Sequence, residues 1–344
     1  MPWASHFLLR QRCASLAITA LTTICLYRLQ LISQTHRTSK TEYTASLFAP
    51  ALGPPAGSIK NLVTFGDSFS DVNSYSNGSP LLWPQYAAAY GNFSLHPYAK
   101  NSAVCSEKLT PRSTRGPGIL EDELPAYFND TASGLYLDPD STIYTLWIGT
   151  NDLGPEGLLV GLNPPNTTIV DVSRCPLDWI KAIYDVGGRN FIIQNAAPLQ
   201  YSVQYQADGY LNGYWLIPHN TTEWNIAIKQ SIAAYNELVS LYLQNLAHTE
   251  LPGAHIGLFS SYGLFEDIHD HPQKYLNGTA PFNVTGCVHS CPVGVDCTTA
   301  EGTERDSFMW YDEVHPSEQT HRVIAKILSD AITRKSEQWI NWLS

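Results

Sequence analysis

The sequence predicts an α/β fold, a three-layer α/β/α sandwich around a central parallel sheet. Short runs rich in β-branched and aromatic residues alternate with longer amphipathic stretches over most of the 344 residues, and this alternation is typical of a parallel sheet covered by helices on both faces. Hydrophobic residues make up 44% of the chain, which is enough for one large core. We find no internal repeat that would indicate a solenoid or a propeller.

Four segments are predicted to be strands because each is short, apolar and bounded by turn residues. They are Asn61–Phe65, Ser141–Ile148, Phe191–Gln194 and His255–Phe259, and we expect His255–Phe259 to be the last strand. Leu95–Cys105 is interpreted as a loop or a short strand. Functional sites of parallel sheets form at the carboxyl ends of the strands, so the residues that follow these segments are the first candidates.

Five segments are predicted to be helices. They are Pro80–Tyr90, Ile119–Phe128, Leu177–Asp185, Thr222–Ala247 and Ser317–Leu328. The longest has apolar residues at helical spacing, which predicts one buried face; these residues are Trp224, Ile228, Ile232, Tyr235, Val239, Tyr242 and Leu246.

Residues 1–40 are predicted to be a signal peptide or a short signal-anchor. They hold five Lys and Arg and no acidic residue, and Cys13–Tyr27 is a stretch of 15 residues without charge. Such a stretch is typical of a signal-peptide core, whereas a full membrane span needs about 20 apolar residues. Leu29–Ile32 could extend it into an anchor, and only then would the protein contact a membrane. Residues 41–60, rich in Pro, Gly and Ala, are interpreted as a linker to a folded domain at 61–344.

The charge and the glycosylation motifs of the remaining chain indicate where the protein acts. Beyond residue 40 there are 15 basic and 31 acidic residues, and a body of this charge repels nucleic acid, so no nucleic-acid partner is expected. Asn-x-Ser/Thr sequons are more frequent than chance predicts, which favours N-glycans and an extracellular location; they begin at Asn77, Asn92, Asn129, Asn166, Asn220, Asn277 and Asn283.

Five cysteines follow the leader, namely Cys105, Cys175, Cys287, Cys291 and Cys297. In an oxidising compartment most of them should form disulfides. His289 lies inside the Cys287–Cys297 cluster and could suggest zinc, but no second ligand pair has zinc-finger spacing, so we favour disulfides. The odd number leaves one thiol free or paired elsewhere.

The stretch Val63–Tyr75 contains the first candidate for a catalytic nucleophile. An apolar segment breaks at Gly66 and presents Ser68. We expect a helix to open there and to direct backbone N–H groups at an anion beside the serine. Asn151 follows the Ser141–Ile148 segment, so Ser68 and Asn151 should lie at the same edge of the sheet.

A serine nucleophile needs a base that is oriented by an acid. Asp312 and His315 are three residues apart and can meet within one turn, where the carboxylate would fix the imidazole tautomer through Nδ1. His269 and His271 flank Asp270 in a segment expected to be an exposed loop. The Ser68 N–H and the Asn151 side-chain amide would stabilise an oxyanion, so the pattern predicts an acyl-transfer enzyme.

Three segments resemble the first, third and fifth motif blocks of the GDSL, or SGNH, hydrolases: FGDSFSD, WIGTND and WYDEVHP. Longer stretches such as IYDVGGRNFIIQNAAPL are most similar to fungal acetyl esterases of carbohydrate esterase family sixteen. The resemblance implies a flavodoxin-like SGNH fold without cofactor or metal, with Ser68 as nucleophile, His315 as base, Asp312 as its orienting acid and Asn151 in the oxyanion hole. It also implies a secreted esterase that removes acetyl groups from oligosaccharides of plant cell walls.

The chain departs from the family at the second motif block, where a glycine usually donates its N–H to the oxyanion. The segment Tyr98–Ala103 places Ser102 there, and a backbone donor survives the change to serine if φ and ψ suit a Cβ atom. Cys105 is the alternative donor under a shifted alignment.

Two other functions remain open at this point. One is a lipid or general carboxylester hydrolase of the same fold, and the other is an inactive glycan-binding protein on this scaffold. Among the tryptophans that could stack on sugar rings, Trp147 and Trp179 are expected to be core residues, and Trp83 is undecided. Trp310, two residues before Asp312, is the expected substrate contact.

Overall fold

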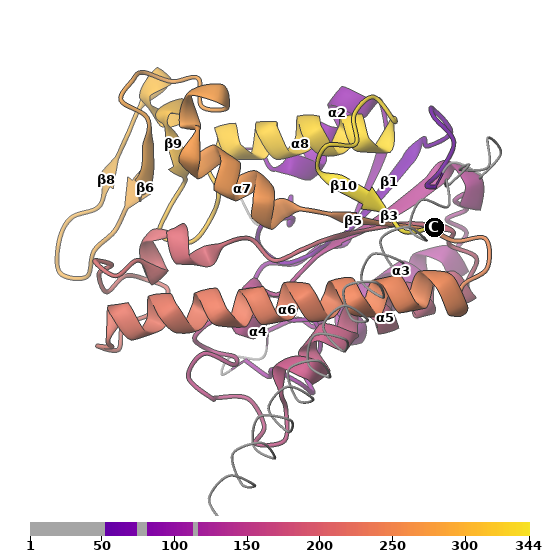
Figure 1. Ribbon diagram of the computed structural model, residues 1–344, viewed down its shortest axis with the longest axis horizontal. Helices are drawn as coiled ribbons and strands as arrows, with labels where there is room; N and C mark the ends of the chain where they lie inside the picture. The colour runs from indigo at the N-terminus through magenta and orange to yellow at the C-terminus, as the bar shows by residue number, and fades with distance from the viewer. Residues whose placement is uncertain (1–51, 74–80, 113–115) are drawn as a thin grey trace, which may run out of the picture. The chain divides into compact units, whose positions relative to one another are not determined.

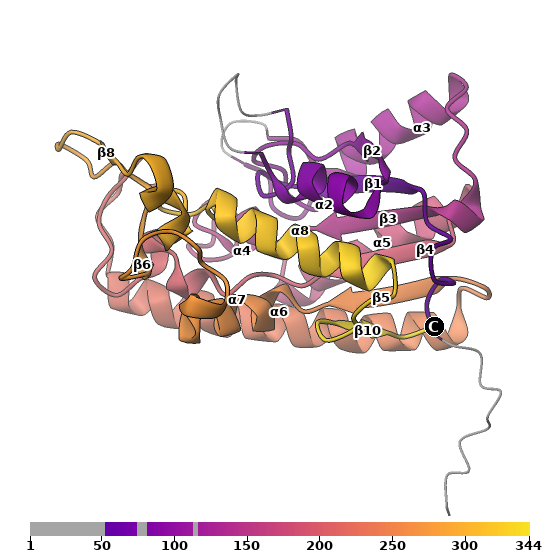
Figure 2. The ribbon, with the colours of Figure 1, turned by 90° about the horizontal axis from the view of Figure 1, so that it is seen from above.

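The central sheet has six strands in the order β10-β5-β4-β3-β1-β2 (Figures 1 and 2). The strands are β1 (Asn61–Gly66), β2 (Ser94–Pro97), β3 (Thr142–Trp147), β4 (Asn190–Gln194), β5 (His255–Phe259) and β10 (Ile340–Trp342). β1 to β5 run parallel to their neighbours, in the order 2-1-3-4-5 of flavodoxin-like sheets. The predicted fold class is therefore confirmed.

The computed structural model describes residues 52–73, 81–112 and 116–344. The predicted leader, residues 1–40, and the first part of the predicted linker lie outside the described residues. None of the described helices combines the length and the apolar composition needed to cross a lipid bilayer.

Helices cover both faces of the sheet (Figures 1 and 2). One face is covered by α2 (Trp83–Gly91), α7 (Ser261–Asp270) and α8 (Glu318–Ile332), and the other by α3 (Leu124–Ala132), α5 (Ile169–Asp185) and α6 (Thr221–Thr249). A π-helical turn, Ile119–Glu123, leads into α3, and the short α4 (Thr150–Leu153) follows β3. Two small strand pairs lie outside the sheet: β6 (Asn283–Cys287) with β9 (Phe308–Trp310), and β7 (His289–Ser290) with β8 (Thr298–Thr299).

Aromatic side chains join each face of the sheet to its helices. Phe65 of β1 contacts Tyr127 of α3 and Trp179 of α5. On the opposite face Trp147 of β3 contacts Phe265 of α7. Trp147 and Trp179 are 2% and 0% exposed, so the prediction that both belong to the core is confirmed. These clusters fix the sheet edge from which the functional residues project.

α5 and α6 show how the observed helices differ from the predicted ones. α5 begins at Ile169, well before the predicted start at Leu177, because Thr168 caps it by donating its N–H and its hydroxyl to Asp171, and the helix continues through Pro176. In α6 the buried stripe follows the predicted positions except that Leu243 is buried in place of Tyr242. Leu243 is four residues after Val239, and this spacing keeps the buried residues on one face of so long a helix better than the three-residue spacing to Tyr242.

His269 lies in the last turn of α7 and not in a loop, so that part of the prediction was wrong, whereas His271 follows the helix and is exposed, as expected. Ser260 caps α7 by accepting the N–H of Gly263, a start signal that the sequence reading passed over. His269 stacks on Tyr201 with ring centres 4.2 Å apart and is only partly exposed, and His271 forms an ion pair with Asp267.

The last strand is β10, not β5 as predicted. It pairs antiparallel with β5 at the edge of the sheet, and three residues are too few to show a sequence periodicity. The chain end also fixes part of the predicted linker, since the Gly53 N–H donates to the Ser344 carbonyl oxygen at 2.8 Å and Ile59 is 4% exposed. Residues of the predicted linker after position 51 therefore pack against the folded domain.

Candidate active site

Ser68 and Asn151 follow the carboxyl ends of the adjacent strands β1 and β3. The strand order reverses between these two strands, where sheets of this class open a crevice. Gly66 ends β1 with φ 147°, and a Cβ atom there would lie 2.4 Å from the Trp147 carbonyl oxygen. Glycine is therefore required at this position, and the chain that leaves it carries Ser68 into the crevice.

Ser68 does not begin a helix, contrary to the prediction. The N–H groups of Ser70 and Asp71 donate to the Asp67 carbonyl oxygen at 2.9 and 3.0 Å, which forms a single turn, and the next described helix starts at Trp83. No macrodipole argument therefore applies to Ser68. Its own N–H has no acceptor among the described residues, so it is free to donate to a ligand.

Ser68, His315 and Asp312 form a continuous chain of hydrogen bonds. His315 Nε2 lies 2.8 Å from Ser68 Oγ, and His315 Nδ1 lies 2.9 and 3.0 Å from the two carboxylate oxygens of Asp312. Because Nδ1–H donates to the carboxylate, Nε2 can accept the serine proton. Asp312 Oδ1 also accepts the backbone N–H groups of Val314 and His315, which fixes the carboxylate within its own turn.

The electrostatics of the pair suit a base and its orienting acid. Burial works against ionisation of Asp312, but the charge of His315 and the hydrogen bonds to the carboxylate outweigh it and lower the pKa of Asp312 to about 2. Burial would likewise lower the pKa of His315, but attraction to Asp312 outweighs it, so this pKa is raised above its ordinary value. The imidazole is thus a stronger proton acceptor than an isolated histidine.

Tyr214 is a contact of this group that the sequence did not reveal. Its hydroxyl donates to Asp312 Oδ2 at 2.7 Å and lies 3.1 Å from His315 Nδ1. Tyr214 comes from the loop before α6. The sequence of this loop has no helix or strand periodicity, and only folding of the chain brings Tyr214 to Asp312. The carboxylate is therefore hydrogen-bonded on both oxygens.

Ser102 has the geometry of a backbone oxyanion donor. From Lys100 to Cys105 every backbone N–H except that of Ser102 has an acceptor among the described residues. The Cys105 N–H, which was the alternative, donates to the Asp152 carboxylate at 3.1 Å. Ser102 lines the same cavity as Ser68, and its φ of 64° is left-handed, as the family's usual glycine would allow.

Asn151 completes the ring of donors around this cavity. Its Nδ2 donates to the Ala103 carbonyl oxygen at 2.8 Å, and its Oδ1 accepts from Arg112 at 2.6 Å. One N–H of the amide is thereby left for a ligand. The N–H groups of Ser68 and Ser102 and this amide all border one cavity, an arrangement that can receive a negatively charged oxygen.

The cavity is small and is lined mainly by polar residues. Its volume is about 80 Å³, far below the few hundred Å³ of sites for drug-sized ligands. Besides the residues above it is lined by Asn101, Glu156, Gln204 and Tyr205. Gln204 is 2% exposed, and its Oε1 is a buried acceptor with no hydrogen-bond partner among the described residues.

The prediction that Trp310 contacts substrate was wrong. Trp310 is 0% exposed, and its ring packs against Phe265 with centres 5.6 Å apart. It ends β9, where its side chain points into the core while Asp312, in the turn that follows, reaches the site. Trp83, also 0% exposed, is likewise a core residue.

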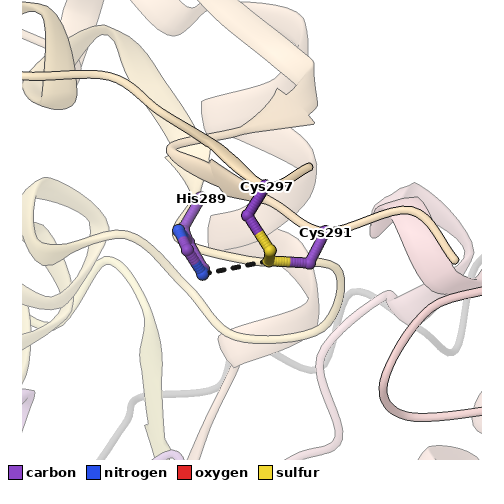
Figure 3. Close-up of side chains that lie close together, drawn as sticks. All are labelled: His289, Cys291 and Cys297. Atoms are coloured by element: carbon purple, nitrogen blue, oxygen red, sulfur yellow. Dashed lines mark hydrogen bonds between the residues drawn. A yellow bond between two sulfur atoms is a disulfide. The ribbon is translucent and has the colours of Figure 1, made fainter. Parts of the chain in front are cut away.

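The cysteines form disulfides, as favoured over zinc. Cys105 bonds to Cys175, Cys291 bonds to Cys297, and Cys287 is a buried free thiol. Figure 3 shows the His289 ring beside the second disulfide, with Nε2 3.1 Å from Cys291 Sγ. These three side chains have metal-ligand chemistry, but joined sulfurs lack the thiolate charge that zinc requires.

Comparison with known proteins gives a consistent picture. The family model of the GDSL-like lipase/acylhydrolases matches residues 62–328. An acetylesterase from Hypocrea jecorina is 30% identical over 87% of this chain and 97% of its own length. One from Thermothelomyces thermophilus is 23% identical over 80% of this chain and 88% of its own. Among solved structures, an acetylxylan esterase from Geobacillus stearothermophilus aligns with 82% of this chain and 95% of its own at 10% identity and a TM-score of 0.43.

Proposed function

The chain belongs to the GDSL-like lipase/acylhydrolase family and is a carboxylic ester hydrolase, and we propose that it removes acetyl groups from carbohydrates with Ser68 as its nucleophile. The observation that supports this proposal most directly is the hydrogen-bonded chain from Ser68 through His315 to Asp312. Each member of it has a defined part in ester hydrolysis.

In the first half of the reaction Ser68 Oγ attacks the ester carbonyl carbon while His315 Nε2 takes the serine proton. The carbonyl oxygen becomes an oxyanion, which accepts hydrogen bonds from the N–H groups of Ser68 and Ser102 and from Asn151 Nδ2. The intermediate collapses to an acyl-enzyme, and His315 returns the proton to the departing sugar oxygen. Asp312 stabilises the imidazolium that exists in between.

In the second half water replaces the sugar. His315 takes a proton from water as its oxygen bonds to the acyl carbon, and the same donors receive the second oxyanion. Acetic acid leaves with the second proton of water and ionises in solution, and His315 passes its proton to Ser68 Oγ, which restores the free enzyme.

Acetyl esters of hydroxylated alcohols suit the cavity best. A volume of about 80 Å³ beside Ser68 accommodates a short acyl group and leaves little room for a long one. Gln204, Glu156 and Asn101 provide polar partners for sugar hydroxyls. The two relatives named acetylesterases support the same choice.

A lipid or general ester substrate is the second candidate, and one observation favours it. Leu216 and Ile217, close to Tyr214 in the chain, are 65% and 60% exposed. Exposed apolar residues can receive an acyl chain where they adjoin a site, although neither of these residues lines the cavity. The two candidates differ in how rate depends on acyl length, because a groove gains about 0.8 kcal/mol per buried CH₂ whereas a closed cavity rejects longer chains.

We further propose that the protein is secreted and carries N-glycans. Asn92, Asn129, Asn166, Asn220 and Asn277 are exposed. Asn283 is half-buried and accepts a backbone N–H through Oδ1, and Asn77 lies outside the described residues. Glycosidase treatment of secreted protein should lower its mass, and peptide mapping should find glycan first at the exposed positions.

The test of function compares p-nitrophenyl esters from acetate to octanoate with acetylated xylo-oligosaccharides. We expect kcat/KM to be highest for acetate, lower for propionate and near zero for octanoate, with acetate released from the oligosaccharides. Ser68→Ala should lose about 10⁴–10⁶ of the rate and keep its unfolding temperature. Rates that rise toward octanoate would favour the lipid candidate, and normal turnover in Ser68→Ala would exclude Ser68 as nucleophile.

A further inference from the structure

Arg112 holds the side chain that is proposed to donate to the oxyanion. Its Nη1 donates to Asn151 Oδ1 at 2.6 Å, and Asn151 Nδ2 donates to the Ala103 carbonyl oxygen at 2.8 Å. We propose that Arg112 is a positioning residue that keeps an N–H of Asn151, and not its oxygen, directed at the reacting carbonyl. This inference rests on the proposed role of Ser68 and Asn151 in ester hydrolysis, but not on the identity of the acyl or sugar group.

The amide of an asparagine can rotate by half a turn and exchange its oxygen with its nitrogen. Here the exchanged orientation is unfavourable on both sides. The Asn151 N–H groups would face the N–H donors of Arg112, and Oδ1 would face the Ala103 carbonyl oxygen. An oxyanion beside the exchanged amide would also meet the Asn151 oxygen in place of a donor. Arg112 therefore selects the orientation that can stabilise the transition state.

Arg112 is itself fixed by its neighbours. Its Nη2 forms an ion pair with Glu156 at 2.9 Å, and its side chain is 18% exposed. The segment that precedes Arg112 is held by hydrogen bonds to the Asp152 carboxylate. This carboxylate accepts the Thr110 hydroxyl at 2.6 Å and the Cys105 N–H at 3.1 Å. Asp152 is the residue after Asn151, so this chain segment returns to the end of β3 and delivers Arg112 there.

The chemistry of the guanidinium suits this task. Its several N–H donors are arranged in a rigid plane, so it can bind Glu156 and Asn151 at once. A lysine has a single compact charge on a flexible chain and would hold one of these partners poorly.

The test is a double-mutant cycle with p-nitrophenyl acetate, using Arg112→Met, Asn151→Ala and the double variant. We expect Asn151→Ala to lower kcat by about 10²–10³. Arg112→Met should lower kcat by about tenfold or more, with KM changed by less than about threefold. In the Asn151→Ala background, Arg112→Met should lower kcat by less than about twofold, because Arg112 acts through the amide that is missing.

Two further variants keep the test decisive. Arg112→Lys should recover only part of the lost kcat, and it stands in for Arg112→Met if that variant does not fold. Arg174→Met is the matched control, since Arg174 lies on α5 over the Tyr242 ring, away from the cavity, and its kcat should equal that of the unchanged enzyme.

The outcomes separate this inference from the proposed function. If Arg112→Met has normal kcat, or if its loss is as large in the Asn151→Ala background as alone, Arg112 does not act through Asn151 and the inference is wrong. If Asn151→Ala itself has normal kcat, the proposed oxyanion role of Asn151 fails first. Equal losses in Arg112→Lys and Arg112→Met with a lower unfolding temperature in both would assign Arg112 a structural role only.

Discussion

Replacing Ser102 by glycine should stabilise the protein and leave catalysis unchanged. Ser102 has a φ of 64°, a left-handed conformation in which the Cβ atom of an L-residue crowds the following carbonyl oxygen. Among the described residues its hydroxyl donates only to Asn101 Oδ1, at 3.5 Å, which is at the limit of a hydrogen bond. Ser102→Gly therefore removes the Cβ atom and loses almost no interaction.

The magnitude follows from two opposing terms. A left-handed L-residue costs about 1–2 kcal/mol, and glycine removes this cost. The greater freedom of glycine in the unfolded chain opposes the gain by about 0.5–1 kcal/mol. The net change is about 0.5–1 kcal/mol in favour of the folded state, and for a domain of this size that raises the unfolding temperature by about 1–3 °C.

Thermal unfolding and kinetics on p-nitrophenyl acetate measure the two effects separately. Ser102→Ala is the matched control, because it removes the hydroxyl but keeps the Cβ atom and should give no gain in unfolding temperature. If the oxyanion donor is the backbone N–H, both variants keep kcat within about twofold. The reasoning is refuted if Ser102→Gly is less stable than Ser102→Ala, or if both lose about 10² in kcat, since the hydroxyl would then be the donor.

Three other predictions follow from burial and charge. Asp312→Asn should lower the maximal rate by about 10⁴, and because Asp312 raises the pKa of His315, the acid limb of its residual pH–rate profile should move to lower pH. Burial raises the pKa of Asp67 to about 6, so the unchanged protein gains stability relative to Asp67→Asn as pH falls through 6. If the unfolding temperatures of the two proteins differ by the same amount at pH 5 and pH 8, this prediction is wrong. Trp310→Ala should destabilise the fold by about 3–5 kcal/mol and slow aryl and sugar acetates equally; a selective loss on sugars would restore its substrate role.

The sequence predicted those site residues whose position depends on local order. Ser68 and Asn151 each follow an apolar strand, and parallel strands bring their carboxyl ends to one edge. Asp312 and His315 meet within one turn of the chain. In each case the relevant geometry is set by a few consecutive residues or by the sheet itself, so a pattern of residue types was sufficient.

The residues that sequence reasoning missed depend on contacts between distant loops. Tyr214 reaches Asp312 from 98 positions away, and Arg112 reaches Asn151 from 39 positions away. Neither lies in a segment with helix or strand periodicity. The prediction for Trp310 was wrong for a related reason. Closeness in sequence to Asp312 does not determine the direction of a side chain at a point where a strand ends and a turn begins.

Buried carboxylates explain why the Ser102 N–H, a proposed oxyanion donor, is left free beside the cavity. Glu123, fully buried, accepts the N–H groups of Gly66 and Lys100, and Asp152 accepts that of Cys105. Burial raises the pKa of both acids, which is a cost to the fold that a neutral core would avoid. In return, the loop from Lys100 to Cys105 is held in place. Each of its backbone N–H groups has an acceptor among the described residues, except that of Ser102. The N–H of Ser102 thus remains free because those of its neighbours are held.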